Sequence, residues 1–115
     1  MSNINIGEVI AERYFQLQDE AGVRSEVVLR IGKPLPDPKA GGDWCCPYQI
    51  VGFGDDKVTA VFGVDPMQAL LFGLQKAWFE LHYYQKIHKR KLTWLGEDDL
   101  GLPPLIQSTG TQVNE

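Results

Sequence analysis

Few side chains in this sequence are of the types that carry out chemistry. The two cysteines, Cys45 and Cys46, are adjacent, and the two histidines, His82 and His88, are six residues apart. Adjacent thiols match neither the C-x-x-C redox pattern nor a zinc motif, and on a helix six residues place two rings about 120° apart around the axis. A histidine can act as a general base near neutral pH, but no serine or cysteine nucleophile is evidently paired with one. We therefore predict no catalytic, metal-binding or cofactor-binding residue, and two structural thiols.

Two interpretations fit Asp65 and Gln68, which are three residues apart. As a polar pair beneath a glycine they could be catalytic. At the start of a helix, Asp65 would instead accept a hydrogen bond from a free backbone N–H, and Pro66 would lose no donor that the helix needs. Gln68 would return a bond, as in a capping box. We favour the cap because it explains both residue types and their spacing. Neither common glycine-rich phosphate loop is present.

A basic run, residues 86–91, is the best argument for nucleic-acid binding. It is interleaved with Tyr83, Tyr84 and Trp94, whose rings could stack on bases while the cations neutralise phosphates. The chain as a whole carries a formal charge of −4, and cations at this place also suit the negative end of a helix dipole. We therefore expect no nucleic-acid partner.

Acidic clusters and unusual aromatic residues are the candidate partner-binding positions. The acidic clusters fall in expected turns, where they are either solvated or form a negative patch that steers a basic partner. Phe79 and Tyr83 are four residues apart and lie off the main apolar stripe, and large aromatic residues outside a small core often mark interfaces. The candidates are therefore Asp55, Asp56, Phe79, Tyr83, Glu97, Asp98 and Asp99.

Periodicity predicts the elements that position these residues. A chain of 115 residues with 43% hydrophobic and 23% charged residues has the length and composition of one globular domain. Residues 9–17 fit a strand, interrupted by Arg13, and also a helical stripe; we favour the strand because residues 26–31 need a hairpin partner. The proline-rich residues 32–43 predict an exposed loop. Further strands are expected at 44–53 and 57–64, and Pro47 suggests an edge position or a bulge.

The strongest local pattern predicts a helix from Pro66 to about His88. Its apolar stripe consists of Leu70, Leu71, Leu74, Ala77, Trp78 and Leu81, at intervals of three and four residues. A single helix must then cover the apolar face of the sheet. The expected fold is α+β: a four-stranded antiparallel β-meander packed against one long C-terminal α-helix, with residues 92–104 closing an edge.

Domain organisation and location follow from the same composition. We expect one domain over residues 1–105 and a frayed tail over 106–115. The first residues match no secretory signal, and the longest nearly apolar run is six residues where a membrane span needs about 20. A cytoplasmic protein without membrane contact is therefore expected.

Several sequence fragments resemble a small bacterial domain family of unknown function. They are Arg30-Ile-Gly-Lys-Pro34, Trp44-Cys-Cys-Pro-Tyr-Gln-Ile-Val-Gly52, Gly63-Val-Asp-Pro-Met-Gln-Ala-Leu70, Leu92-Thr-Trp-Leu95 and Leu100-Gly-Leu-Pro103. The first three match the patterns IGxP, CxYxIxG and GxDxxQAL, and the likeness covers residues 10–104. The resemblance implies a bacterial source and an antiparallel sheet with a covering helix, and it implies no activity.

The expected function is a non-enzymatic protein-binding module. Small size, acidity and missing catalytic groups favour an immunity- or antitoxin-like protein, whose partner is another protein or a second copy of the chain. The alternative is a small ligand-binding domain or enzyme with a pocket near Trp44, Tyr48 and His82. A deep cavity with convergent polar groups would favour the alternative, and a flat aromatic or acidic patch the binding module.

Overall fold

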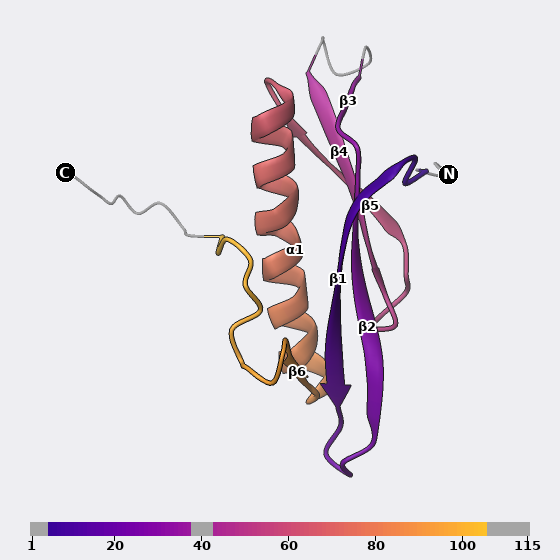
Figure 1. Cartoon of the computed structure of the whole chain (residues 1–115), viewed down its shortest axis with the longest axis vertical. Coiled ribbons are helices and arrows are strands. Elements are labelled where there is room, and N and C mark those ends of the chain that lie inside the picture. Colours follow the sequence, from indigo (N-terminus) through magenta and orange to yellow (C-terminus); the bar gives the residue numbers. More distant parts are fainter. Residues whose placement is uncertain (1–4, 38–42, 106–115) are drawn as a thin grey trace, which may run out of the picture.

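A computed structural model describes residues 5–37 and 43–105, and it has an α+β fold with one long helix on one side of a sheet (Figure 1). The tail expected at 106–115 lies outside the described residues. No helix in the described ranges is long and apolar enough to span a membrane. The elements are β1 (Val9–Gln18), β2 (Arg24–Gly32), β3 (Leu35–Pro36), β4 (Trp44–Val51), β5 (Val58–Gly63), α1 (Pro66–His88) and β6 (Lys91–Thr93).

Over residues 5–37 and 43–105 the antiparallel sheet has six strands, so the prediction of four was wrong. Its order is β3-β4-β2-β1-β6, and β5 pairs with the other edge of β4. Strand β3 forms inside the proline-rich segment expected to be a loop, where Leu35 and Pro36 pair with Cys45 and Trp44. Strand β6 forms inside the segment expected to close an edge, and pairs with residues 16–18 of β1.

Pro47 lies within β4, which is flanked by strands on both sides, and not at an edge. On one side β4 pairs with β5 through its whole first part, Pro47 facing Ala60. On the other side residues 44–45 pair with β3 and residues 48–51 pair with β2. Pro47 therefore falls at the break between two partners, where a missing N–H donor costs the ladder least.

The β1–β2 hairpin forms as expected and is closed by an aspartate and a glycine. The Asp19 carboxylate accepts hydrogen bonds from the backbone N–H groups of Ala21 and Val23, both at 2.9 Å. Gly22 has a φ of +84°, a conformation that favours glycine.

Helix α1 begins at the predicted cap. The Asp65 carboxylate accepts a hydrogen bond from the Gln68 N–H at 2.8 Å, and Pro66 is the first helical residue. The Gln68 side chain accepts from the Val64 N–H, one residue before the position that a standard capping box uses. Polar contacts within the helix terminus therefore account for both side chains.

The phase of the helix differs from the predicted stripe. The buried positions of α1 are Ala69, Gly73, Ala77 and Leu81. A Cβ added to Gly73 would lie 3.2 Å from the Cys46 sulfur, which shows how closely the helix approaches β4. Small residues therefore face the sheet, and Leu71, predicted to be core, is 44% exposed.

The core lies between this helix face and the inner face of the sheet. Alternate residues of β1, β2 and β4 point into it, as the period of two requires. Residues 94–105 return alongside α1 and add two leucines to the core (Figure 1). The buried hydrophobic side chains of the strands are Phe15, Leu17, Val27, Leu29, Ile31, Cys46, Tyr48, Ile50 and Leu92.

Arg13, which interrupts the alternation of β1, attaches this returning segment to the sheet. Its guanidinium donates to the carbonyl oxygens of Leu100 at 3.1 Å and Gly101 at 2.8 Å. It also lies 3.8 Å from the centre of the Trp94 ring, in cation–π geometry. The two carbonyl oxygens and the Trp94 ring together stabilise the Arg13 cation at an inward-facing position of β1.

We expect Arg13→Met to loosen the returning segment without unfolding the sheet. The change keeps the aliphatic stem but removes two hydrogen bonds and the stacked cation, and should lower the free energy of unfolding by about 1–2 kcal/mol. Amide hydrogen exchange should speed up at residues 94–101 and stay slow in β2 and β4. Arg24→Met, at the exposed start of β2, is the control. Unchanged exchange at 94–101 would contradict this role for Arg13.

Candidate interaction surface

Outside its contact with the sheet, α1 exposes a series of large apolar side chains along its whole length. Because small residues occupy the inner face, most of the large ones point outward or sideways. Their exposed fractions run from 39% to 76%. We call this series the helix outer surface: Met67, Leu71, Phe72, Phe79, Tyr83 and Ile87.

Two predicted partner-binding residues, Phe79 and Tyr83, belong to this surface and lie side by side. Their ring centres are 6.2 Å apart and their planes differ by 10°, so the rings are stacked. Both are about half exposed. The sequence identified them because they lie off the expected stripe, and it missed Leu71 because that residue was assigned to the stripe.

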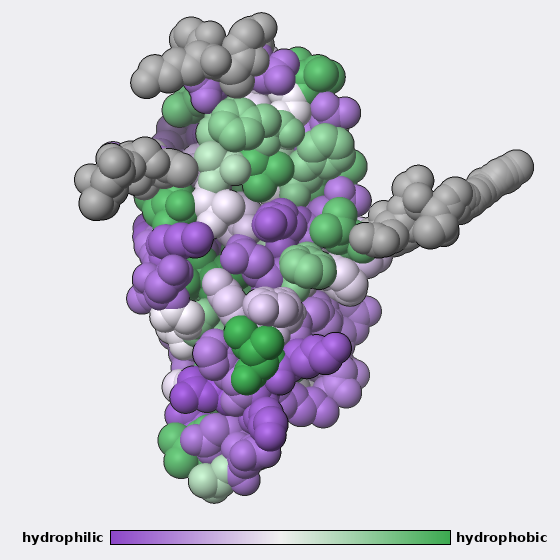
Figure 2. Space-filling model, turned by 180° about the vertical axis from the view of Figure 1, so that it is seen from behind, coloured by the Kyte–Doolittle hydropathy of each residue, from purple (hydrophilic) through white to green (hydrophobic). Residues whose placement is uncertain are grey.

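On one face of the molecule, apolar side chains are concentrated at the end where α1 begins (Figure 2). Seen from behind, hydrophobic side chains gather in the upper part of the molecule and hydrophilic ones cover most of the lower part (Figure 2). A shallow hollow of about 510 Å³ opens over the first turns of α1. Its lining is Asp65, Met67, Gln68, Leu70, Leu71, Phe72 and Leu74.

The acidic candidates lie in two separate turns. Asp55 and Asp56 belong to the β4–β5 turn, and residues 97–99 follow β6. In the sheet order β4-β2-β1-β6, two strands separate those two elements. The sheet therefore does not join the two clusters into one negative patch.

Most of these carboxylates already have local partners. Asp55 accepts from the Lys57 N–H, and Asp56 from the Gly52 N–H. Asp99 accepts from the Gly101 N–H, while Asp98 forms a 3.0 Å ion pair with Lys91. Turn closure thus explains three of the acidic residues.

The aromatic residues beside the basic run do not form a stacking platform. The Tyr84 hydroxyl donates to Glu80 at 3.3 Å, and the Tyr84 ring packs edge-on against Phe53. Trp94 lies beneath Arg13. Of the three rings named with the basic run, only Tyr83 is exposed.

A polar cluster under α1 was not predicted. The Glu80 carboxylate accepts hydrogen bonds from the hydroxyls of both Tyr48 and Tyr84. Tyr48 is 1% exposed, and burial together with the bond to Glu80 raises its pKa well above the ordinary tyrosine value. Burial and the nearby Glu80 carboxylate also raise the pKa of Tyr84. The single carboxylate of α1 is therefore held inward.

These shifts predict that stability falls in alkaline solution. An unfolded tyrosine ionises near pH 10, whereas the folded protein keeps the Tyr48 proton above that pH. The contribution of Tyr48 to stability is therefore complete below about pH 10 and is lost as the pH rises further, by about 1.4 kcal/mol per pH unit for each such proton. The buried Cys46 thiol, whose pKa is raised from 9.0 to about 11, starts the decline near pH 9.

Urea unfolding between pH 8 and pH 12 measures this decline. Tyr48→Phe should make the decline above pH 10 shallower, and should cost about 1–2 kcal/mol at neutral pH because Glu80 loses a donor. Tyr83→Phe, which removes an exposed hydroxyl, is the control. An unchanged alkaline slope in Tyr48→Phe would contradict the assignment.

The three residues of the alternative pocket do not converge. Trp44 and Tyr48 are four strand residues apart, or about 13 Å. His82 follows Glu80 by two residues, about 200° around the helix, so it points away from Tyr48. Its Nδ1 lies 2.8 Å from the Trp78 carbonyl oxygen, and its ring packs on the Trp78 ring.

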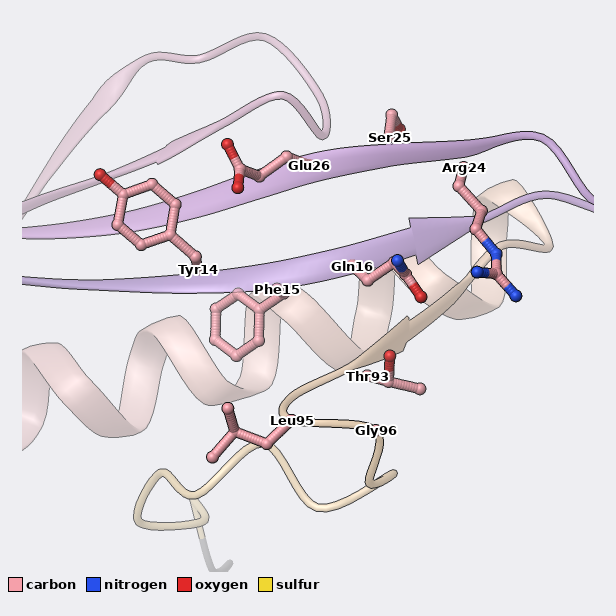
Figure 3. Close-up of a pocket in the computed structure, with 9 residues that line it drawn as sticks. All are labelled: Tyr14, Phe15, Gln16, Arg24, Ser25, Glu26, Thr93, Leu95 and Gly96. Atoms are coloured by element: carbon pink, nitrogen blue, oxygen red, sulfur yellow. The ribbon is translucent and has the colours of Figure 1, made fainter.

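A more polar hollow of about 450 Å³ opens where β1, β2 and β6 meet (Figure 3). The volume falls in the range of ligand sites, but the polar groups are spread along the strands. In Figure 3 the Tyr14 hydroxyl points away from Gln16 and Arg24, and it donates to Glu12 at 3.1 Å. Arg24 and Glu26 give this hollow one positive and one negative charge. Their side chains do not converge on a common point (Figure 3).

Comparison with known proteins identifies a family and no activity. A family model described as "Domain of unknown function (DUF6968)" matches residues 11–104. No curated protein and no solved structure matches the chain. The resemblance to a domain family of unknown function is confirmed, and the bacterial source stays a prediction.

Proposed function

Because the chain belongs to the family described as Domain of unknown function (DUF6968), we propose its function from geometry alone: it is a non-enzymatic protein-binding module. The helix outer surface is the contact region. The observation that carries the proposal is the exposure of six large apolar side chains on one helix whose small residues face the sheet.

The size and composition of this surface support a protein partner. Taking about 150–200 Å² for a whole large side chain, the six residues together expose roughly 500 Å² of apolar area. Phenylalanine, tyrosine and methionine are also enriched at protein interfaces. The patch is therefore large enough for the centre of an interface that buries about 800 Å² per partner.

The acidic turns have a secondary place in this proposal. Since they lie at two separate positions of the sheet, we assign them at most to the rim of the contact. An immunity- or antitoxin-like role is one form of the proposed function, and the identity of the partner decides between it and others.

Capture from a lysate of the source organism tests the surface, provided that matched variants are compared. Phe72→Ser with Phe79→Ser removes two anchors of the helix outer surface. Ile10→Ser with Val23→Ser changes two residues of the β1–β2 hairpin that are at least as exposed as the two phenylalanines. The wild type and the hairpin variant should retain the same protein, and the helix variant should lose it while keeping its circular dichroism spectrum. Equal retention by all three would overturn the proposal.

A further inference from the structure

We propose that the segment docking on the helix outer surface is an acidic amphipathic helix of another protein. The inference rests on the proposed function and goes further, because it specifies the chemistry of the partner. It follows from the charges that α1 exposes beside its apolar side chains.

All the exposed charges along α1 and its C-terminal end are positive. The exposed charged residues between Pro66 and Lys91 are Lys76, Lys86, Lys89, Arg90 and Lys91. The only carboxylate in that range, Glu80, is turned inward and accepts hydrogen bonds from two tyrosines. A chain with a net charge of −4 therefore presents a basic helix.

The two lysines of the helix, Lys76 and Lys86, share one face with the three aromatic anchors of the helix outer surface. Lys76 follows Phe72 by four residues and precedes Phe79 by three, and residues at these spacings are neighbours on a helix surface. Lys86 follows Tyr83 by three residues, which also makes them neighbours on the helix surface. Among the described residues the recorded ion pairs are Arg30–Glu12 and Lys91–Asp98, so no described carboxylate within ion-pair distance compensates Lys76 or Lys86.

A complementary partner presents apolar residues at helical spacing with carboxylates beside them. An amphipathic helix supplies anchors at i, i+3, i+4 and i+7. The shallow hollow over the first turns of α1 can take such side chains, because most of its lining is apolar. Glutamates or aspartates flanking the anchors would then lie against Lys76 and Lys86, and opposite potentials favour the contact and its rate of formation.

The same charges disfavour two other occupants. A two-fold contact between copies places the same patch against itself, so lysines would meet lysines with no exposed carboxylate on either helix. A nucleic acid would match the lysines but not the aliphatic side chains of Met67, Leu71 and Ile87, and Tyr84 and Trp94 are engaged elsewhere. The experiment below therefore also measures self-association and nucleic-acid binding.

Two synthetic peptides of about 18 residues, five helical turns, separate the possibilities. They share a leucine pattern at i, i+3, i+4 and i+7, and carry glutamate in one and lysine in the other at the remaining positions. Binding to the full chain is followed by fluorescence anisotropy. The acidic peptide should bind at least about tenfold more tightly at low salt, and the difference should shrink near 0.5 M salt.

Variants locate the binding. Lys76→Glu with Lys86→Glu should reverse the preference, whereas Lys33→Glu with Lys57→Glu, the same charge change at other exposed positions, should leave it unchanged. Phe72→Ser with Phe79→Ser should abolish binding of both peptides.

The outcomes distinguish this inference from the proposed function. Equal binding of both peptides, no binding of either, or tighter binding of single-stranded oligothymidine overturns the acidic-helix inference. So does a concentration-dependent dimer that the phenylalanine variant abolishes. The proposed function falls only if capture of a natural partner does not depend on the helix outer surface.

Discussion

Leu81→Ala is expected to lower the free energy of unfolding by about 3–4 kcal/mol, whereas Leu71→Ala lowers it by less than about 1 kcal/mol. Leu81 is fully buried between α1 and the sheet, and Leu71 is 44% exposed on the helix outer surface. Truncating a buried leucine loses its transfer free energy and leaves a cavity, and truncating an exposed one does neither to the same extent. Loss of a few kcal/mol is a large fraction of the 5–15 kcal/mol that typically stabilises a domain.

Urea unfolding of the two variants measures this difference directly. Both changes replace leucine by alanine in one helix, so helix propensity contributes equally to both. If Leu81→Ala prevents folding, Leu81→Met gives a milder change at the same site. Equal losses in the two alanine variants would mean that α1 is rotated about its axis, and the helix outer surface would no longer exist.

The phase of α1 could not be read from its large residues alone. A stripe drawn through the leucines and Trp78 overlaps the buried face at Ala77 and Leu81, but it is rotated away from Ala69 and Gly73. Ala69 and Gly73 contribute little to a hydrophobic pattern, yet they let the helix approach β4 closely enough for Gly73 to meet Cys46. Close packing favours small residues where a helix lies near a strand, as Gly73 does near Cys46. The periodicity of one sequence does not show which residue lies opposite.

Strand prediction succeeded where alternation was long enough. Strands β1, β2, β4 and β5 have six to ten residues and were all predicted. Strands β3 and β6 have two and three residues, which is too short for a period of two to be evident. These two strands form because β4 and β1 have unpaired edges next to them. The sequence near β3 or β6 does not show that such an edge is close.

The candidate surface was recovered in part for the same reason. Phe79 and Tyr83 were identified because they fit no buried face. The Tyr48–Glu80–Tyr84 cluster was missed because Tyr48 and Glu80 are 32 residues apart, and nothing in the sequence near either residue indicates the other. The basic run at the end of α1 was evident from the sequence, but the inward position of Glu80 was not.

Gly63→Ala is expected to destabilise the protein by about 3 kcal/mol or more. A Cβ at this position would lie 2.5 Å from the Ala69 nitrogen and 2.9 Å from the Gln68 carbonyl carbon. Both are backbone atoms of the first turn of α1, so no side chain can rotate away. Either β5 or the start of the helix must shift, and overpacking of this kind costs about 1–3 kcal/mol even where side chains can adjust.

Gly73→Ala is the graded control, because it adds the same methyl group to the same helix–sheet contact. Its Cβ would meet the Cys46 sulfur at 3.2 Å, a side-chain atom that can move by a few tenths of an ångström. Alanine also has a higher helix propensity than glycine, by about 1 kcal/mol, so we expect a net change within about 1 kcal/mol. Thermal and urea unfolding of both variants decide the matter. If Gly63→Ala proved as mild as Gly73→Ala, β5 would not be held against the first turn of α1, and the short connection through Asp65 would not set the position of the helix on the sheet.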